Sequence, residues 1–338
     1  MENILISGGL GFIGSSLASY FLKNSDVRKI FLLDNLIRTG SETRVSSFEK
    51  NNRVEIIRVN IDNLNWHSKV NAKIDVFFHC AAQVAVTTSI VDPWLDFHSN
   101  ASSTLSMLEF ARKNKVEFSH EPLFFYSSTN KVYGNLKDLE VQLDKNGYCF
   151  KANENGISEQ SPAQPITPYG TSKYCGELLV KEYSATFGIS AVVFRKSCIF
   201  GSQQTGIIDQ GWISFMTQSA INDSKLVFFG DGYQTRDVLV VDDLVQCYKK
   251  VIDSHVSQQL SKFEIFNIGG GKNNVFSLRK VAELLEKYLS KKIDIEVMDW
   301  RQNDQKVYIS DISKISSLGW KPLSSVEEEI LSAVQKLN

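Results

Sequence analysis

A phenol, an ammonium and a hydroxyl are spaced in this chain so that they can move a proton. Tyr169 and Lys173 stand four residues apart in a segment with a helical pattern at 169–187, and side chains at i and i+4 share one helical face. An ammonium beside a phenol favours the phenolate and lowers a tyrosine pKa from its reference of about 10. Thr129, just beyond an apolar run at 123–126, adds a hydroxyl that can orient an oxygen of the substrate. These three residues predict proton abstraction from an alcohol whose carbon gives a hydride to a nicotinamide.

A glycine-rich turn near the start of the chain has the spacing of a dinucleotide-binding loop. Three glycines spaced GxxGxxG separate an apolar run at 3–7 from an apolar-periodic stretch at 12–22. Missing side chains let the backbone approach a pyrophosphate, and the helix N-terminus attracts the anion. A plain tight turn is the alternative when the spacing is taken alone. The residues expected to hold the pyrophosphate are Gly8, Gly11, Phe12, Ile13 and Gly14.

The ends of the following strands should complete the cofactor site, because ligands of open parallel sheets bind beyond the carboxyl ends of the strands. Asp34 can accept hydrogen bonds from the adenosine ribose and repel a 2′-phosphate, which favours NAD over NADP. Arg38 and Arg44 leave NADP open, although solvated loop charges are the simpler interpretation. Further candidates are Asn35, Ile61, Asp62, Ala81, Ala82 and Gln83. For Asp62 the alternative is a helix cap, and for the two alanines it is tight packing.

The rhythm of apolar segments indicates the scaffold that positions these residues. Short, nearly continuous apolar runs, with helical patterns between several of them, occur at 3–7, 29–33, 54–59, 76–80, 123–126 and 191–195. This alternation predicts an α/β fold, a Rossmann-type doubly wound parallel sheet with helices on both faces. Past residue 200 the pattern changes, with helices expected at 213–222, 242–253 and 278–289 and strands at 225–229 and 293–298.

Two domains are therefore expected. Residues 1–200 should form the cofactor-binding domain that carries the catalytic residues, with parts of the later chain returning to it, and residues 201–338 should form mainly a smaller α/β substrate lobe. The stretch 135–168 is predicted to be one long irregular loop, and a loop of that length is more often functional than idle.

Composition excludes several classes of partner. Lysine plus arginine (37) nearly equals aspartate plus glutamate (38), so no global field draws the chain to nucleic acid or to an anionic membrane. No apolar run approaches the roughly 20 residues of a membrane span, and the start of the chain has no signal-peptide pattern, so we expect a cytoplasmic location. The five cysteines form no CxxC pair, which indicates neither a disulfide framework nor a metal site.

Five motifs in a fixed order resemble the extended short-chain dehydrogenase/reductase family. They are the glycine turn, Asp34, the HCAAQ segment at 79–83, the SSTNKVYG segment at 127–134 and the YxxxK pair at 169–173, and the resemblance runs from residue 3 to about residue 322. It implies that Thr129, Tyr169 and Lys173 form a catalytic triad, with Lys173 also touching the nicotinamide ribose. It further implies a tightly bound, recycled NAD, and it places the structural asparagine of the family at Asn100, which we count among the cofactor-site candidates.

The residues after Thr129 indicate which reaction follows oxidation of a sugar. Sugar-nucleotide 4,6-dehydratases of this family carry an Asp-Glu pair there, whereas this chain has Asn130 and Lys131, which favours epimerisation over loss of water. The segments TNKVYG at 129–134 and DQGW at 209–212 resemble the CDP-paratose (CDP-tyvelose) 2-epimerases of the family. The resemblance implies transient oxidation at C2 of a CDP-hexose and hydride return to the opposite face. A UDP-hexose 4-epimerase, a dehydratase and a catalytically silent NAD- or nucleotide-sugar-binding protein are the alternatives.

A nucleotide diphosphate calls for cations that make paired hydrogen bonds. The substrate candidates, mostly placed by family pattern, are Thr129, Asn130, Lys131, Ser197, Gln210, Arg236, Arg301 and Asp304. The alternatives are a salt bridge from Arg236 to Asp237 or Asp231, and a solvated loop position for Arg301. By resemblance the protein is also expected to form a homo-oligomer, a dimer or tetramer.

Overall fold

In a computed structural model, residues 1–207, 209–301 and 303–337 are described, and Gln302 of the motif at 299–305 lies outside them. The chain divides into two compact units. Unit 1 comprises Met1–Val132, Thr167–Arg195 and Lys249–Ile265, and unit 2 comprises Tyr133–Ile166, Lys196–Tyr248 and Phe266–Asn338. The domain boundary expected near residue 200 stays a prediction.

A seven-stranded sheet is the scaffold of unit 1, with its last strands running on into unit 2. Its order is β3-β2-β1-β4-β5-β8-β12, and the pairs from β3 through β5 are parallel. The predicted doubly wound sheet is therefore confirmed. The strands are β1 (Asn3–Ser7), β2 (Lys29–Asp34), β3 (Val54–Arg58), β4 (Val76–His79), β5 (Leu123–Thr129), β8 (Ser190–Lys196) and β12 (Phe263–Ile268). The sequence patterns did not reveal β12.

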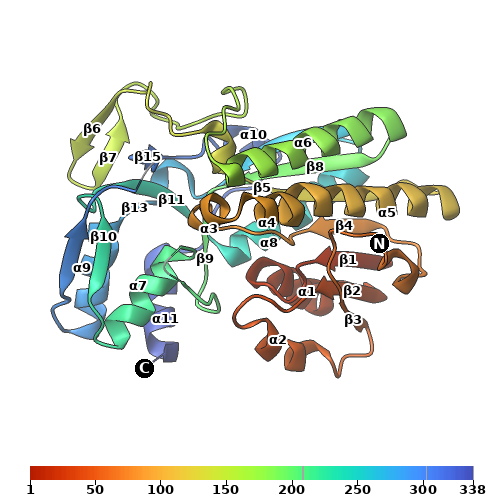
Figure 1. Cartoon of the computed structure of the whole chain (residues 1–338), viewed down its shortest axis with the longest axis horizontal. Coiled ribbons are helices and arrows are strands. Elements are labelled where there is room, and N and C mark those ends of the chain that lie inside the picture. The colour runs from red at the N-terminus through yellow and green to blue at the C-terminus, as the bar shows by residue number, and fades with distance from the viewer. Residues whose placement is uncertain (208, 302, 338) are drawn as a thin grey trace. The chain divides into compact units, whose positions relative to one another are not determined.

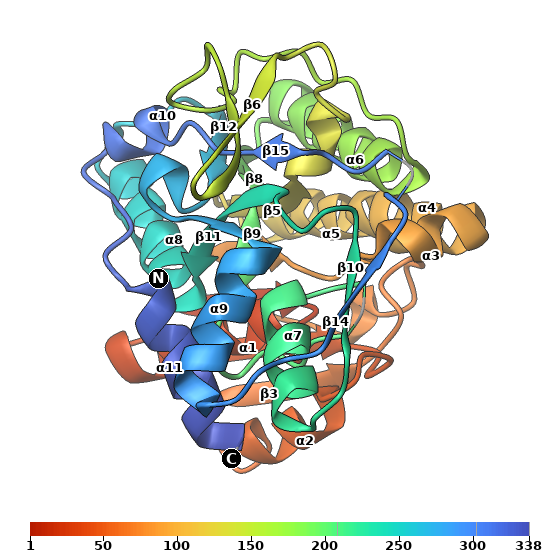
Figure 2. The same ribbon diagram turned by 90° about the vertical axis from the view of Figure 1, so that its left-hand side faces the viewer.

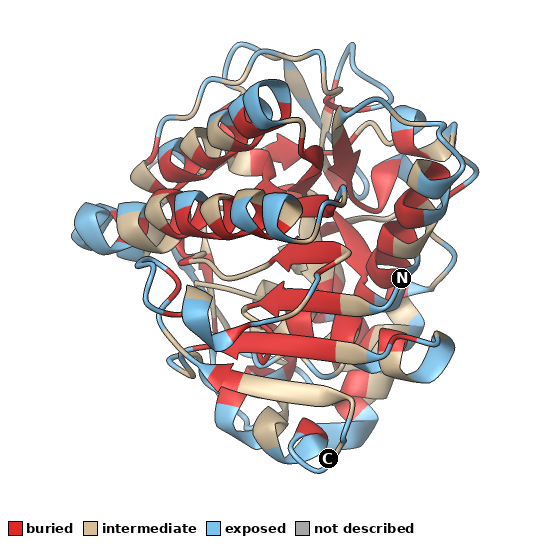
Figure 3. Ribbon diagram, turned by 90° about the vertical axis from the view of Figure 1, so that its right-hand side faces the viewer, coloured by how far each residue is buried: buried red, intermediate tan, exposed pale blue. Residues whose placement is uncertain are grey.

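Side chains alternate between the two faces of this sheet, as the period of a strand requires. Phe77 of β4 belongs to one buried cluster with Met107 of α5 (Ser103–Glu117) and Val180 of α6 (Pro168–Phe187). Its neighbour Phe78 points the other way and lies 5.6 Å, ring centroid to ring centroid, from Phe21 of α1 (Phe12–Asn24). Most strands of the sheet are buried (Figure 3), whereas the edge strand β3 is mostly of intermediate burial, and α5 and α6 lie side by side (Figure 1).

Shorter elements of unit 1 connect these strands and helices. They are α2 (Ser41–Phe48), η1 (His67–Lys69), α3 (Val86–Val91), α4 (Pro93–Phe97), the π-helical turn η2 (His98–Ser102) and η3 (Asn130–Tyr133), whose last residue begins unit 2. Asp92 caps α4 by accepting a hydrogen bond from the Leu95 N–H, and Pro93 occupies the first turn. Thr167 caps α6 in the same way through Gly170, with Pro168 next to it. These caps fix where the two helices begin.

Unit 2 packs three helices around its own apolar core. Met216 of α7 (Trp212–Ile221), Leu285 of α9 (Leu278–Leu289) and Ile330 of α11 (Val326–Leu337) belong to one buried cluster, and the helices lie together in Figure 2. The strands are β9 (Cys198–Phe200), β10 (Leu226–Phe229), β11 (Thr235–Val240), β13 (Val275–Ser277), β14 (Ile295–Met298) and β15 (Val307–Tyr308). The other helices are α8 (Val241–Val256), which begins in unit 2 and ends in unit 1, η4 (Gly271–Asn273) and α10 (Ser313–Ser316).

The stretch 135–168 is not irregular throughout, so that prediction was wrong in part. It contains an antiparallel hairpin of β6 (Val141–Asp144) and β7 (Gly147–Phe150), in which Asp144 pairs with Gly147. Gly147 has a φ of 127°, which a side chain would strain. The Asn-Gly dipeptide at 146–147 is a strong hairpin signal and would have revealed this turn.

Candidate functional site

The glycine turn of unit 1 is built so that only glycine fits at two of its positions. Gly8 has a φ of 64°, and a Cβ there would lie 2.7 Å from the backbone nitrogen of Ala81. A Cβ on Gly14 would lie 2.2 Å from the Gly8 carbonyl oxygen. At Gly11, the N-cap of α1, a Cβ would meet only the Gly8 oxygen, at 3.1 Å. The start of α1 at Phe12 and Ile13 is thus left open to an anion.

Asp34 and two arginines hold the same turn. The buried Asp34 carboxylate accepts the N–H of Leu10 at 2.9 Å through Oδ2. Arg44 donates to the Leu10 carbonyl at 3.4 Å, and Arg38 donates to the Ala82 carbonyl at 3.4 Å. Burial lowers the pKa of both guanidinium groups. The view of these arginines as solvated loop charges is therefore corrected, because both cover the turn.

The remaining cofactor candidates lie at the strand ends of unit 1. Asn35 donates to Asn60 Oδ1 at 2.9 Å, which ties the ends of β2 and β3 together. Ile61 is buried, whereas the next residue, Asp62, is exposed. Ala81 donates its N–H to Ser7 Oγ at 3.3 Å, so its segment passes directly beside the glycine turn.

Thr129, Tyr169 and Lys173 come together in unit 1 from β5 and α6. All three are buried, with Tyr169 8% and Lys173 2% exposed. The Thr129 hydroxyl lies close enough to the Tyr169 phenol to lower its pKa, and the Lys173 ammonium lies 4.5 Å from the centroid of the Tyr126 ring. Asn130 and Lys131 follow directly, and the Lys131 N–H donates to Thr129 Oγ1 at 3.3 Å. Their side chains introduce no carboxylate beside Thr129.

The phenol of Tyr169 does not have the lowered pKa that the Lys173 spacing predicted. Burial raises the pKa of Tyr169 to about 12, and the Asp96 carboxylate also acts to raise it. The hydrogen bond from Thr129 and the charge of Arg38 act to lower it, but desolvation outweighs both. Spacing along a helix places the ammonium but does not reveal how deeply the phenol is buried.

The sequence analysis missed a buried polar cluster beside the triad, formed by Asp96, Gln83, Asn100 and Ser172. The Asp96 carboxylate, 0% exposed, accepts hydrogen bonds from the other three side chains. Asn100 also donates to Ser172 Oγ at 3.0 Å, while its own Oδ1 is buried without a hydrogen-bond partner. Asp96 lies on a helix of five residues, too short for apolar periodicity to mark it as buried.

A second missed cluster anchors the strand that carries Thr129. Glu177, four residues beyond Lys173 on α6, accepts a hydrogen bond from Ser128 Oγ. Arg195 of β8 donates to the same carboxylate, with Nη2 2.7 Å from Oε2, and both side chains are buried. This ion pair ties β5, α6 and β8 together and fixes the main chain next to Thr129.

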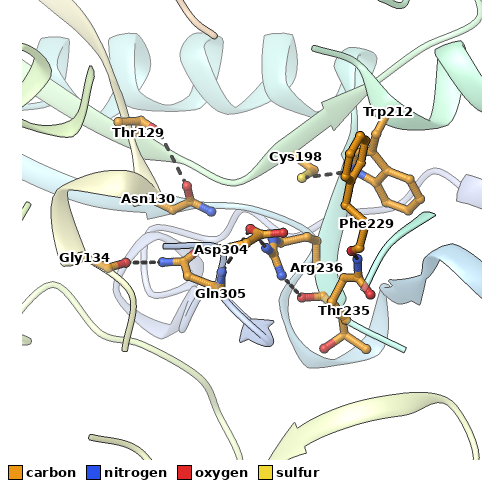
Figure 4. A network of polar contacts seen from close by, with 11 residues as sticks. Thr129, Asn130, Gly134, Cys198, Trp212, Phe229, Thr235, Arg236, Asp304 and Gln305 are labelled. Atoms are coloured by element: carbon orange, nitrogen blue, oxygen red, sulfur yellow. Dashed lines mark hydrogen bonds and ion pairs between the residues drawn. The ribbon is translucent and has the colours of Figure 1, made fainter. Parts of the chain in front are cut away.

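In unit 2 the predicted phosphate-binding arginines form ion pairs that the sequence did not indicate. Arg236, with its side chain 12% exposed, has Nη2 2.8 Å from Asp304 Oδ1 (Figure 4). The expected alternatives, Asp237 and Asp231, have other partners: Asp237 accepts hydrogen bonds from Ser197 and Gly271, and Asp231 accepts them from Tyr148 and Tyr233.

Arg301 is also not simply solvated. Its Nη2 lies 3.3 Å from Asp209 Oδ1, and its guanidinium carbon lies 4.1 Å from the centroid of the Phe229 ring. The motifs at 209–212 and 299–305, far apart in sequence, therefore meet in unit 2. The Phe229 ring beside Arg301 was not among the predicted site residues, although Phe229 closes a predicted strand.

The other candidates of unit 2 lie in the same region or within the core. Gln210 forms a β-bridge with Ile207 and is partly exposed. Trp212 begins α7 and donates from Nε1 to Cys198 Sγ at 3.4 Å (Figure 4). The Ser197 hydroxyl donates to the Asp237 carboxylate and to the Asp237 carbonyl oxygen, so it is already used in a contact with β11 within unit 2.

The fold and the glycine turn define a dinucleotide-binding protein of the short-chain dehydrogenase/reductase type, with an ionisable pair at the carboxyl end of its sheet. Residues 4–269 match the NAD dependent epimerase/dehydratase family. The chain belongs to this family, and the predictions of the family and of NAD as cofactor are confirmed.

Relatives within the family differ in the sugar they act on. The chain is 33% identical to CDP-paratose 2-epimerase of Salmonella typhi, over 97% of this chain and 96% of that protein. It is 30% identical to a putative UDP-glucose 4-epimerase of Methanocaldococcus jannaschii, over 98% and 97% of the two chains. The crystal structure of Bacillus cereus UDP-glucuronic acid 4-epimerase with UDP-glucuronic acid and NAD superposes with a TM-score of 0.83 at 27% identity, covering 99% and 100%.

The described residues lack two kinds of feature. None of their helices combines the length and the apolar character needed to cross a membrane. They also contain no cluster of three or more histidine, cysteine, aspartate or glutamate side chains arranged to hold a metal ion.

Proposed function

We propose that the protein is an NAD-dependent nucleotide-sugar epimerase that inverts C2 of a CDP-hexose, as in the conversion of CDP-paratose to CDP-tyvelose. The observation that carries the proposal is that Thr129, Tyr169 and Lys173 are buried together in unit 1, with Tyr169 and Lys173 on one helix and no carboxylate at Asn130 and Lys131. The relation to a CDP-paratose 2-epimerase over nearly the whole chain supports the choice of sugar and nucleotide.

The residues of unit 1 fit a dinucleotide. The open N-terminus of α1 suits the pyrophosphate, because the turn leaves space at Gly11 where a side chain would stand. Asp34 suits the adenosine ribose. Near the triad, the buried and unpartnered Oδ1 of Asn100 offers an acceptor that a bound group can use. NAD, when bound, accepts a hydride from the sugar and gives it back.

Tyr169 is the proton acceptor and donor in this proposal. Its phenolic oxygen takes the proton of the C2 hydroxyl while the hydrogen on C2 leaves with its electron pair as hydride, so that the C–O bond becomes a carbonyl. The 2-keto sugar turns, the hydride returns to the opposite face of C2, and Tyr169 gives the proton back to the oxygen. Thr129 orients that oxygen, and Lys173 supplies positive charge beside the developing alkoxide. The sum of both halves is redox-neutral.

Unit 2 is proposed to hold the nucleotide. Arg236 and Arg301 would bind the diphosphate through paired N–H groups, in exchange for part of their contact with Asp304 and Asp209. Asp304 would then accept a hydrogen bond from a ribose hydroxyl. The Phe229 ring, already stacked on Arg301, offers a flat face to a base, and Gln210 lies next to Asp209 in the same motif.

A UDP-hexose 4-epimerase is the second candidate, because a putative UDP-glucose 4-epimerase is 30% identical over the whole length. The same triad serves C2 or C4, depending on which carbon faces the nicotinamide. Steady-state assays with matched CDP- and UDP-sugars, with NMR of the products, separate the two. A CDP-sugar inverted at C2 supports the proposal, and inversion at C4 of a UDP-sugar alone rejects it.

A further inference from the structure

Asp96 is a buried carboxylate beside the proton-transfer residues of unit 1, and unlike Glu177, which is paired with Arg195, it has no basic side chain among its hydrogen-bond partners. Asp96 is fully buried on α4. Its Oδ1 accepts Gln83 Nε2 at 2.9 Å and Asn100 Nδ2 at 3.1 Å, while its Oδ2 accepts the Ser172 hydroxyl. Burial raises the pKa of Asp96, whereas the three hydrogen bonds and the charge of Lys173 oppose that rise. These four interactions favour the ionised carboxylate.

The connection from Asp96 to the triad is short. Ser172 lies between Tyr169 and Lys173 on α6, so its hydrogen bond attaches Asp96 to the turn of helix that carries both. The two charges act on each other, because Lys173 favours the ionised Asp96 while the Asp96 charge disfavours the phenolate of Tyr169. A like charge near a phenol delays its ionisation to higher pH.

Few other charged groups face this pair. Arg38, after β2, favours the phenolate. His79 of β4 lies near Lys173, and burial together with that ammonium holds its pKa well below the usual range, so it is neutral. Among the elements packed against α6, α3 (Val86–Val91) has no ionisable side chain and His98 of η2 lies against Trp94. Glu177 of α6 is paired with Arg195 of β8, and Glu109 of α5 is paired with Arg112. Asp92 caps α4.

We propose that Asp96 is the buried counter-charge of the Tyr169–Lys173 pair and, through Ser172, sets the pH at which Tyr169 takes a proton from the substrate. Asp96 is a positioning residue that touches no reacting atom. The inference rests on Tyr169 being the proton acceptor of the proposed function.

Asp96→Asn is a sharp test because the amide fits the same hydrogen bonds. Its Oδ1 can keep both amide donors, and its Nδ2 can donate to Ser172 Oγ, whose hydroxyl can turn to the Tyr169 carbonyl 3.1 Å away. The variant therefore removes the charge and leaves the geometry. Asp96→Ser is a second neutral variant, in case the first is poorly folded, and thermal unfolding shows which variants are native.

Two readouts follow the ionisation of Tyr169 in the NAD-bound enzyme. The first is the acid limb of the pH profile of kcat/KM, which rises with pH as the phenolate forms. The second is the tyrosinate absorbance of each protein minus that of its Tyr169→Phe counterpart, which needs no turnover. We expect Asp96→Asn to move both midpoints to lower pH by on the order of one unit, since removing a nearby negative charge favours the phenolate.

Asp75→Asn is the matched control. Asp75 directly precedes β4 in unit 1, and its carboxylate accepts hydrogen bonds from the N–H groups of Glu2 and Asn3. It should leave both midpoints where they are. Midpoints unchanged in Asp96→Asn and Asp96→Ser, or moved to higher pH, would overturn the inference. If no nucleotide sugar is epimerised but the absorbance midpoint still falls, the role of Asp96 stands and the proposed function fails.

Discussion

Tyr169 is the residue on which the proposed chemistry depends. Replacing it by phenylalanine removes one oxygen and leaves the packing of α6, so NAD should stay bound while epimerisation falls by about 100-fold or more, the usual contribution of a positioned acid or base. Product NMR and the absorbance of bound NAD measure the two effects. Activity near that of the unchanged protein would show that Tyr169 does not move the proton.

Removing the charge of Arg38 should shift the pKa of Tyr169 in the opposite direction to removing the charge of Asp96. Burial raises the pKa of Tyr169 to about 12, and the Arg38 charge is one of two effects that lower it. The phenolate is the active form, so activity falls as pH drops below the pKa that Tyr169 has in the NAD-bound enzyme. Arg38→Met should therefore move the acid limb of kcat/KM to higher pH. An unchanged or lower midpoint would refute the role of Arg38. The control is Arg58→Met, which removes an arginine from an exposed ion pair with Glu42.

At the scale of elements, the glycine turn and the first helix allow a paired experiment. Gly14→Ala places a Cβ 2.2 Å from the Gly8 carbonyl oxygen, so the turn must shift. We expect this variant to lose about 2 kcal/mol or more of unfolding free energy and to lose NAD binding as well. Gly11→Ala meets only one atom, at 3.1 Å, so it should fold nearly as well and yet bind NAD weakly. Urea unfolding and NAD titration separate the two. Equal stability losses in both variants would contradict this account of the turn.

The Glu177–Arg195 pair joins three elements and should matter for stability. Glu177→Gln leaves a buried guanidinium without its counter-charge, which costs about 3–5 kcal/mol when one partner of such a pair is removed. The double variant Glu177→Leu with Arg195→Met removes both charges and should recover most of that loss. Urea unfolding at neutral pH provides the comparison. A double variant as unstable as the single one would show that the charges are not the cause.

The elements were predictable to different degrees for physical reasons. Apolar runs located most of the parallel sheet because its strands are buried on both faces, and the strand at Asn3–Ser7 and the helix at Leu278–Leu289 have the predicted bounds. Strand β12 was missed, and its first three residues are only partly buried. The partners of Arg236 and Arg301 could not be predicted, because Asp304 and Asp209 reach them only through the folded chain. Asp96 was missed because its helix has only five residues, too few for apolar periodicity to mark a buried position.

At the scale of the whole molecule, substitutions in the two units should affect different kinetic constants. Arg236→Lys keeps the charge but loses the planar fork, so the KM for a nucleotide sugar should rise by roughly 10-fold or more while NAD binding and thermal stability hold. Tyr169→Phe should instead lower kcat. Steady-state kinetics with an NAD titration tests this division of labour. A fall in kcat alone for Arg236→Lys would contradict it.

The measurement that tests the central claim most directly is epimerisation of a CDP-hexose in deuterated water without added NAD, followed by NMR of the sugar protons. Hydride that leaves C2 and returns to the opposite face never exchanges with solvent. We therefore predict a new C2 epimer that retains protium at C2. Deuterium at C2 would contradict hydride return, and a product inverted only at C4, a keto sugar or no product would contradict the proposed reaction.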